Sequence, residues 1–264
     1  MLASIRSPRL HLFVANDDPR RYLPRPATEH ALAQLEVRLL KDCAAATLLV
    51  GPPGIGKSLL LRVLVQQLRS TLRTVTLGAG DIDATTLCAF VLDQLRADPG
   101  DDPEHALLML AADYGMKRSA LVIALDSAEQ LPLETAGRLG ALAVTAGGSL
   151  RIVAAAQEPA TALARALGCE DDVVALRTPM NLRETQAHLE AALAAGCAPP
   201  EVRELFHGLS AARIFREANG IPSAVNAIAE EQLATAVREG TVAEPGRAAW
   251  GRITPKKQRP IVSL

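Results

Sequence analysis

The chain has 264 residues, enough for one large domain or for a main domain with a small second one. Hydrophobic residues make up 49% of it and charged residues 22%, a balance that excludes intrinsic disorder for most of the chain. With 28 Lys and Arg against 29 Asp and Glu, the formal net charge is -1. Nucleic acid would therefore have to be held by a local basic patch, because the molecule has no overall positive field.

Cysteine usage and apolar patterning exclude several further classes. The five histidines lack metal-ligand spacing, and no C-x-x-C pair is present, so neither a zinc site nor a disulfide framework is indicated. The N-terminal apolar stretch carries Arg6 and Arg9, unlike a signal peptide, and no apolar run approaches the roughly 18 residues of a membrane helix. We expect a cytoplasmic protein without direct membrane insertion. The four scattered cysteines are Cys43, Cys88, Cys169 and Cys197.

Hydrophobic periodicity predicts strands that alternate with helices, the pattern of a parallel sheet covered by helices on both faces. The predicted strands are 47–50, 73–77, 121–125, 150–156 and 173–176. The predicted helices are 27–40, 57–68, 85–95, 103–114 and 133–146. The runs at 121–125 and 150–156 are continuously apolar, as expected of strands buried on both faces.

Beyond residue 180 the strands stop and only helices are predicted. Asn181 and Glu184 match a capping box, which opens the first of these helices. We therefore predict an α/β nucleotide-binding domain over 1–180, a small all-helical domain over 181–240 and a flexible tail over 241–264. The alternative for the tail is a docking peptide anchored by Trp250. The predicted helices of the second domain are 181–195, 202–206, 210–218 and 223–239.

The strongest functional signal directly follows the first predicted strand. The segment 51–58 reads Gly-Pro-Pro-Gly-Ile-Gly-Lys-Ser and fits the pattern G-x-x-x-x-G-K-[ST]. Glycines let the backbone turn its N–H groups inward around phosphate oxygens, and the helix that follows adds unpaired N–H groups and the positive end of its dipole. We predict that ATP and Mg2+ bind here. The predicted nucleotide-binding residues are Gly51, Pro52, Pro53, Gly54, Ile55, Gly56, Lys57, Ser58 and Leu59.

Three side chains are expected to act on the phosphates and the metal ion. Lys57 would reach the β- and γ-phosphates, and the hydroxyl of Ser58 would bind Mg2+. Asp126 ends the buried strand 121–125, and a carboxylate at that position holds Mg2+ through water. A purely structural capping role is the alternative for Asp126.

Two further polar residues follow strand ends. ATP-hydrolysing proteins of this class place Glu directly after the Asp, but this chain has Ser127, a weak base. Glu129 could swing in as the catalytic carboxylate, or it could be a surface residue of the next turn. Gln157 ends the strand 150–156 and could place its amide near the γ-phosphate, the "sensor 1" role, or it could cap the helix that begins near Pro159.

These motifs resemble those of a known family, the AAA+ ATPases of the general secretion pathway protein A (ExeA) type, which group with transposition ATPases among P-loop proteins. The likeness covers roughly residues 13–240. Outside the phosphate loop it is carried by segments 18–24, 157–159, 179–185 and 220–226, of which the third resembles the opening of the family's lid domain.

The resemblance implies an AAA+/ASCE P-loop NTPase fold, a parallel sheet sandwiched by helices with a small all-α lid. It also implies an ATPase that converts ATP and water to ADP and phosphate, self-association into an oligomer, and a protein partner in a larger machine. An envelope or secretion role would run through a separate partner at the inner membrane.

The chain departs from the family at two positions. The "sensor 2" Arg that contacts the γ-phosphate is Ser223 here, and the usual Glu is Ser127. Because Arg contacts of this kind are worth about 10³–10⁵ in rate, we predict slow hydrolysis. Arg213 or Arg216 could compensate for Ser223, or both could be solvated. Arg165 is the candidate for the Arg that completes a neighbouring subunit's site. The alternative is that Arg165 is an ordinary surface residue.

The resulting hypothesis is a nucleotide-dependent switch or motor. One alternative is a DNA-loaded ATPase of the transposition-helper type, which the near-neutral charge disfavours. Another is a scaffold that senses ATP without hydrolysing it. A STAND-type signalling ATPase is also compatible with the phosphate loop.

Overall fold

The computed structural model describes residues 12–13 and 18–242. The predicted tail therefore lies almost wholly outside the described residues, as does Trp250. Contacts divide the described residues into two units, residues 18–177 and residues 12–13 with 178–242. We call them the α/β unit and the helical unit and describe each by itself.

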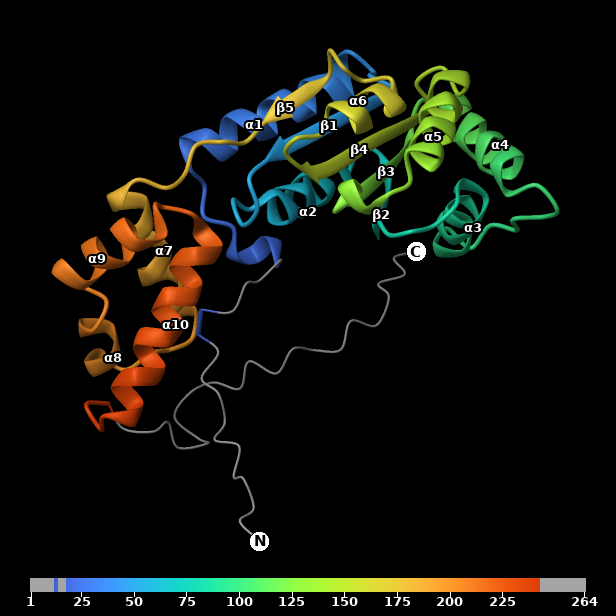
Figure 1. Cartoon of the computed structure of the whole chain (residues 1–264). Coiled ribbons are helices and arrows are strands. Elements are labelled where there is room, and N and C mark those ends of the chain that lie inside the picture. The colour runs from blue at the N-terminus through green and yellow to red at the C-terminus, as the bar shows by residue number, and fades with distance from the viewer. Residues whose placement is uncertain (1–11, 14–17, 243–264) are drawn as a thin grey trace, which may run out of the picture. The chain divides into compact units, whose positions relative to one another are not determined.

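A sheet of five parallel strands forms the centre of the α/β unit, in the order β2-β3-β4-β1-β5 (Figure 1). Since both faces are covered, the central strands are buried along their whole apolar length, as their sequences predicted. Because all strands are parallel, their carboxyl ends meet at one edge, where the phosphate loop leaves β1. The strands are β1 (Ala46–Gly51), β2 (Arg73–Gly78), β3 (Leu121–Asp126), β4 (Leu150–Gln157) and β5 (Val173–Ala175).

Helices cover both faces of this sheet. One face, with Leu48, Ile123 and Ile152, packs against α3, α4, α5 and α6 in a continuous apolar core. The helix α2 packs against α1 and against the strands β1, β3 and β4. The α-helices are α1 (Pro26–Glu36), α2 (Lys57–Leu68), α3 (Ala84–Gln94), α4 (Pro103–Met116), α5 (Leu133–Thr145) and α6 (Thr161–Leu167). Shorter helical turns are η1 (Pro19–Arg21), η2 (Val37–Lys41) and η3 (Ala128–Gln130).

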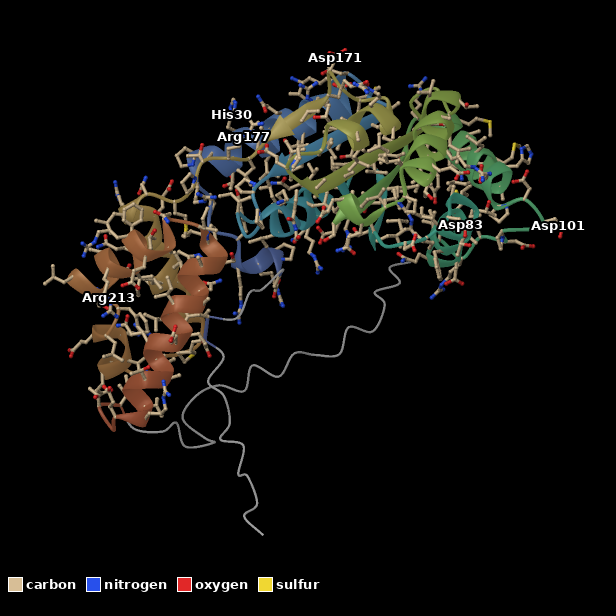
Figure 2. The ribbon with its side chains drawn as sticks, in the orientation of Figure 1. His30, Asp83, Asp101, Asp171, Arg177 and Arg213 are labelled. Carbon is tan, nitrogen blue, oxygen red and sulfur yellow. The ribbon has the colours of Figure 1, made fainter. Side chains whose placement is uncertain are left out.

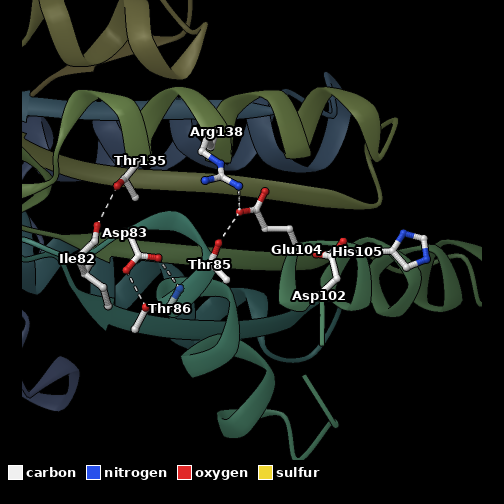
Figure 3. Close-up of polar contacts among 9 residues, drawn as sticks. All are labelled: Ile82, Asp83, Thr85, Thr86, Asp102, Glu104, His105, Thr135 and Arg138. Carbon is white, nitrogen blue, oxygen red and sulfur yellow. Dashed lines mark hydrogen bonds and ion pairs between the residues drawn. The ribbon is translucent and has the colours of Figure 1, made fainter. Parts of the chain in front are cut away.

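Partly exposed polar contacts connect α3 and α4 to one another and to α5 (Figure 3). Glu104 accepts a hydrogen bond from Thr85 Oγ1 at 3.0 Å and pairs with Arg138 at 2.5 Å. Thr135 Oγ1 donates to the carbonyl oxygen of Ile82 at 2.8 Å. Because α3 and α4 lie between β2 and β3 while α5 follows β3, the contacts hold the β2–β3 crossover against α5.

The helical unit packs four helices around its own core. Asn181 and Glu184 form the predicted capping box at the start of α7. Phe13 belongs to this core, with its ring 4.9 Å from that of Phe206, although the domain prediction placed residues 1–180 together. The helices are α7 (Leu182–Ala195), α8 (Pro200–Glu204), α9 (Leu209–Ala218) and α10 (Pro222–Arg238).

The first and last helices of this unit start from one backbone contact. Met180 N–H donates to the Gly220 carbonyl at 2.8 Å. Gly220 has φ +68°, and a Cβ there would lie 2.0 Å from the Met180 oxygen, so only glycine fits. One turn further on, His188 Nε2 and Asn226 Oδ1 lie 2.7 Å apart. The Gly and Asn of segment 220–226 thus have structural roles within the helical unit.

Two predicted helix boundaries were wrong. The helix predicted over 27–40 ends as α-helix at Glu36 and continues as a π-helical turn, with Asp42 N–H bonded to the Val37 carbonyl. The helix predicted over 202–206 starts earlier, because Pro200 suits the first helical position, where no N–H is needed. Within the described residues, no helix combines the length and apolar character needed to cross a membrane.

Candidate nucleotide-binding site

The loop between β1 and α2 has the backbone geometry of a phosphate nest. Gly54 has φ +74° and Gly56 has φ +107°, values that side chains rarely tolerate. Gly56 is also the N-cap of α2, and no side chain caps this helix. The first-turn N–H groups and the positive end of the helix dipole are therefore available to an anion.

The start of this loop is fixed by a close backbone approach that the sequence pattern did not reveal. Leu176 N–H donates to the Val50 carbonyl at 2.8 Å, which brings the segment after β5 against the end of β1. A Cβ on Gly51 would lie 2.2 Å from the Leu176 carbonyl oxygen. The first glycine of the motif is thus required for packing as well as for the turn.

Lys57 folds over the loop that precedes it. Its Nζ donates to the carbonyl oxygens of Gly51 at 2.8 Å and Pro52 at 2.9 Å. Burial lowers the pKa of Lys57 from its ordinary value, while the carboxylates of Glu129, Asp126 and Glu158 oppose that shift. The ammonium is therefore half-buried beside the loop, where a bound phosphate would supply its counter-charge.

The hydroxyl of Ser58 and the carboxylate of Asp126 converge next to Lys57. Ser58 Oγ donates to Asp126 Oδ1 at 2.8 Å, and the same oxygen accepts the Ser127 N–H at 2.9 Å. Magnesium prefers oxygen ligands, and it commonly takes one or two carboxylates together with phosphates and waters. This donor pair fits Mg2+ bound with a nucleotide, and within the described residues no cluster of three or more His, Cys, Asp or Glu side chains forms a separate metal site.

The turn after Asp126 directs a carboxylate back to the site. Ser127 has φ +56°, and η3 follows with Ala128 buried. Glu129 then accepts the Gln157 N–H at 3.1 Å, which joins the turn after β3 to the end of β4. Glu129 is an exposed residue of the turn after β3, as its surface interpretation predicted, although its carboxylate bonds the end of β4. A catalytic role for Glu129 stays a prediction.

Gln157 is paired in register with Gly51, so it lies one strand away from the phosphate loop. Its side chain is exposed. The helix α6 begins at Thr161 with Ala160 as its N-cap and no side-chain cap, so Gln157 does not have the capping role considered above. Its contact with the γ-phosphate stays a prediction.

A pocket of about 340 Å3 adjoins this edge of the sheet. Val50, Ala164 and Val173 contribute an apolar lining, and Glu158 and Arg177 also line it. Arg177 Nε donates to Glu158 Oε1 at 2.8 Å. The pocket therefore lies between α6, β5 and Val50, the last residue before the phosphate loop.

The other arginines considered above have local partners. Arg165 is 76% exposed, with its Nε 3.8 Å from Glu170. In the helical unit, Arg213, labelled in Figure 2, lies on α9. It donates to Gln232 at 2.9 Å, and Arg216 donates to a carbonyl of its own helix. The predicted roles of all three stay untested, and Ser223 lies in the first turn of α10.

Comparison with known proteins identifies the fold. Residues 41–162 match the family model described as an AAA domain. The comparison with curated proteins gave no match.

Solved structures match over most of the chain, at low sequence identity. Cdc6p from Pyrobaculum aerophilum is 20% identical with a TM-score of 0.58, over 87% of this chain and 66% of that one. The Aeropyrum pernix ORC2 protein, solved as ADPNP-ADP complexes, is 15% identical with a TM-score of 0.57, over 89% and 67%. The Aeropyrum pernix ORC1 protein, solved in complex with DNA, is 15% identical with a TM-score of 0.62, over 88% and 65%.

This chain thus spans about two thirds of the length of these proteins. Its α/β unit has a five-stranded parallel sheet, with a phosphate loop between β1 and α2 and an acidic residue at the end of β3. The chain therefore has the P-loop fold of AAA+ ATPases, and residues 41–162 are the part of it that matches the AAA domain model.

Proposed function

We propose that this protein is an ATP-dependent switch that binds ATP with Mg2+ in the 51–59 loop and hydrolyses it slowly. The observation that carries the proposal is the convergence of Lys57, Ser58 and Asp126 at a glycine loop that opens an uncapped helix. The ADPNP-ADP complexes of the Aeropyrum pernix ORC2 protein, which has a similar fold, support nucleotide as the ligand.

Each residue of the site has a separate task. The loop N–H groups and Lys57 bind and orient the phosphates, because they present donors and a positive charge to them. Ser58 and Asp126 hold the metal ion. When bound, Mg2+ neutralises charge on the β- and γ-phosphates. The amide of Gln157 would meet the terminal phosphate from the neighbouring strand.

Slow turnover follows from the groups that would activate water. Ser127 replaces the usual carboxylate, and a hydroxyl is a weak base at neutral pH. Glu129 is the nearest replacement, but its carboxylate is bonded to the Gln157 N–H. Ser223 offers no positive charge to the γ-phosphate. The ATP-bound state would therefore be long-lived, as suits a switch.

The partners follow from the family resemblance. The ExeA-like motifs favour self-association around bound nucleotide and a protein partner in a larger assembly, in the cytoplasm or peripheral to the inner membrane. Two units with separate cores give such a switch two bodies that can respond to nucleotide.

Calorimetric titration of ATP in the presence of Mg2+ tests the nucleotide claim. We expect Lys57→Ala to weaken ATP binding at least about tenfold, because a charged hydrogen-bond donor to phosphate is lost. Lys41→Ala, which removes an exposed lysine elsewhere in the same unit, is the matched control and should bind like the wild type. Equal ATP affinity of Lys57→Ala and the wild type would contradict the proposal.

A DNA-loaded ATPase is the second candidate, favoured by the similarity to the Aeropyrum pernix ORC1 protein solved with DNA. Fluorescence anisotropy with a labelled duplex, with ATP or ADP and at several salt concentrations, separates the two. Binding that requires ATP and falls steeply with salt supports the second candidate. No binding at low salt excludes it.

A further inference from the structure

The phosphate site has an excess of negative charge. Three carboxylates, those of Glu129, Asp126 and Glu158, lie close enough to Lys57 to act on its ammonium. A triphosphate adds more negative charge than one Mg2+ ion and one lysine offset. At the position where the resembling family has a phosphate-directed Arg, this chain has Ser223. A second cation beside the loop would therefore offset part of this charge.

The backbone brings one arginine to the start of the phosphate loop. Leu176 is hydrogen-bonded to Val50, and its carbonyl oxygen packs against Gly51. The next residue along the chain is Arg177. Since β1 lies between β4 and β5 in the sheet, Glu158 and Arg177 approach the end of β1 from its two sides.

The contact of Arg177 with Glu158 is a partial one. Only Nε donates, to Oε1 at 2.8 Å, and the side chains are 68% exposed for Arg177 and 30% for Glu158. The two terminal NH2 groups of Arg177 make no hydrogen bond to any residue among 12–13 and 18–242. Ion pairs this exposed contribute little, because water screens them, so a more highly charged acceptor competes effectively.

We propose that Arg177 is a specificity-determining residue that exchanges Glu158 for the terminal phosphate of ATP and so makes the site prefer ATP to ADP. This inference rests on the proposed nucleotide binding. A guanidinium suits the role because it presents planar, paired donors to phosphate oxygens. It would supply from the same chain the positive charge that Ser223 does not.

The surroundings of Arg177 leave room for this exchange. Arg177 lines the pocket of about 340 Å3 between α6, β1 and β5, where Thr161 is a polar neighbour. The exposed side chain can therefore change rotamer without displacing the apolar core. Arg165, by comparison, extends from α6 toward Glu170, and no hydrogen bond connects it to the phosphate loop.

Separate titrations with ATP and with ADP, both with Mg2+, test the proposal. We expect Arg177→Ala to weaken ATP binding about tenfold and ADP binding less than twofold, because the lost charged hydrogen bond reaches only the terminal phosphate. Arg177→Lys keeps the charge without the paired donors, so its ATP affinity should lie between that of the wild type and that of Arg177→Ala. Arg69→Ala, which removes an exposed arginine at the C-cap of α2, is the matched control and should leave both affinities unchanged.

The partner residue gives an independent measurement. Glu158→Gln removes the carboxylate that competes with phosphate for Arg177, so ATP should bind more tightly while ADP is unchanged. Weaker or equal ATP binding by this variant would contradict the exchange. The thermal unfolding of each variant without nucleotide shows whether the fold is intact.

The inference and the proposed function fail in different ways. If Arg177→Ala binds ATP as the wild type does, or loses ATP and ADP affinity equally, Arg177 does not read the terminal phosphate. In that case Lys57→Ala still reports on nucleotide binding itself. If the wild type binds neither nucleotide, the proposed function fails first.

Discussion

Ser58 Oγ donates a hydrogen bond to Asp126 Oδ1 at 2.8 Å, across 68 positions of sequence. One residue lies in the first turn of α2 and the other ends β3. The side-chain oxygens of the two predicted metal ligands are therefore in direct contact. Substituting Asp126 tests whether they bind the metal ion together.

Replacing Asp126 with Asn should remove most of the effect of Mg2+ on ATP binding. The amide keeps the shape but lacks the charge, so the affinity for Mg·ATP should fall by about tenfold or more, in line with changes around metal sites. Titration with ATP, with Mg2+ present and with Mg2+ removed by EDTA, measures this change in affinity. Asp113→Asn, an exposed change on α4, is the control. An unchanged response to Mg2+ would remove Asp126 from the metal site.

Restoring the family's carboxylate should accelerate turnover. Ser127→Glu places a general base next to Asp126, and we expect the rate of phosphate release to rise by about tenfold or more, as is typical of acid–base groups. Ser127→Gln is the matched control, since it adds similar bulk at the same left-handed position without the charge. If both variants turn over at the wild-type rate, the missing acid does not limit hydrolysis.

Gly51→Ala should destabilise the fold. The added Cβ would lie 2.2 Å from the backbone oxygen of Leu176, and overpacking of this kind costs about 2 kcal/mol in unfolding free energy. Gly80→Ala meets nothing within 4 Å and should change stability by no more than about 0.5 kcal/mol. Urea unfolding of both variants checks the difference. Equal stabilities would mean that the segment after β5 can yield.

The contacts between α3, α4 and α5 should affect stability without affecting the nucleotide site. Glu104→Ala breaks the hydrogen bond from Thr85 and the pair with Arg138, at an expected cost of about 1 kcal/mol. Asp101→Ala, in the exposed turn before α4, is the control (Figure 2). A large loss of ATP affinity in Glu104→Ala would show that these contacts reach the site.

The cysteines should divide into two reactive and two protected thiols. Burial raises the pKa of Cys88 and that of Cys169 from 9.0 to about 12, whereas Cys43 and Cys197 are exposed. The protected thiols stay neutral when folded, so their contribution to stability is complete below pH 9 and declines as the pH rises toward 12. Thiol labelling of native and denatured protein counts both groups. Four fast-reacting thiols in the native state would contradict the fold.

The sequence was sufficient for the parts of the site that depend on local pattern and on parallel topology. The phosphate motif, the apolar run before Asp126 and the capping box at Asn181 each have a short-range signature, and parallel strands bring their carboxyl ends together. It was insufficient where distant segments meet. The approach of Leu176 to Gly51 leaves no periodic trace in the sequence.

The same limit applies to the packing of Phe13 in the helical unit and to the bond between Glu129 and the Gln157 N–H. The packing of Phe13 depends on which of the two cores takes up the short apolar segment that contains it. The bond from the Gln157 N–H to Glu129 depends on the left-handed turn at Ser127. Neither is encoded by spacing. The ExeA-like lid motif predicted a helical unit, while the structural reasons for Gly220 and Asn226 emerged only from their contacts.

The backbone contact between Met180 and Gly220 gives the helical unit a short connection between distant parts of its chain. It joins the residue two positions before α7 to the residue two positions before α10, so the starts of the first and last helices are linked without α8 or α9 between them.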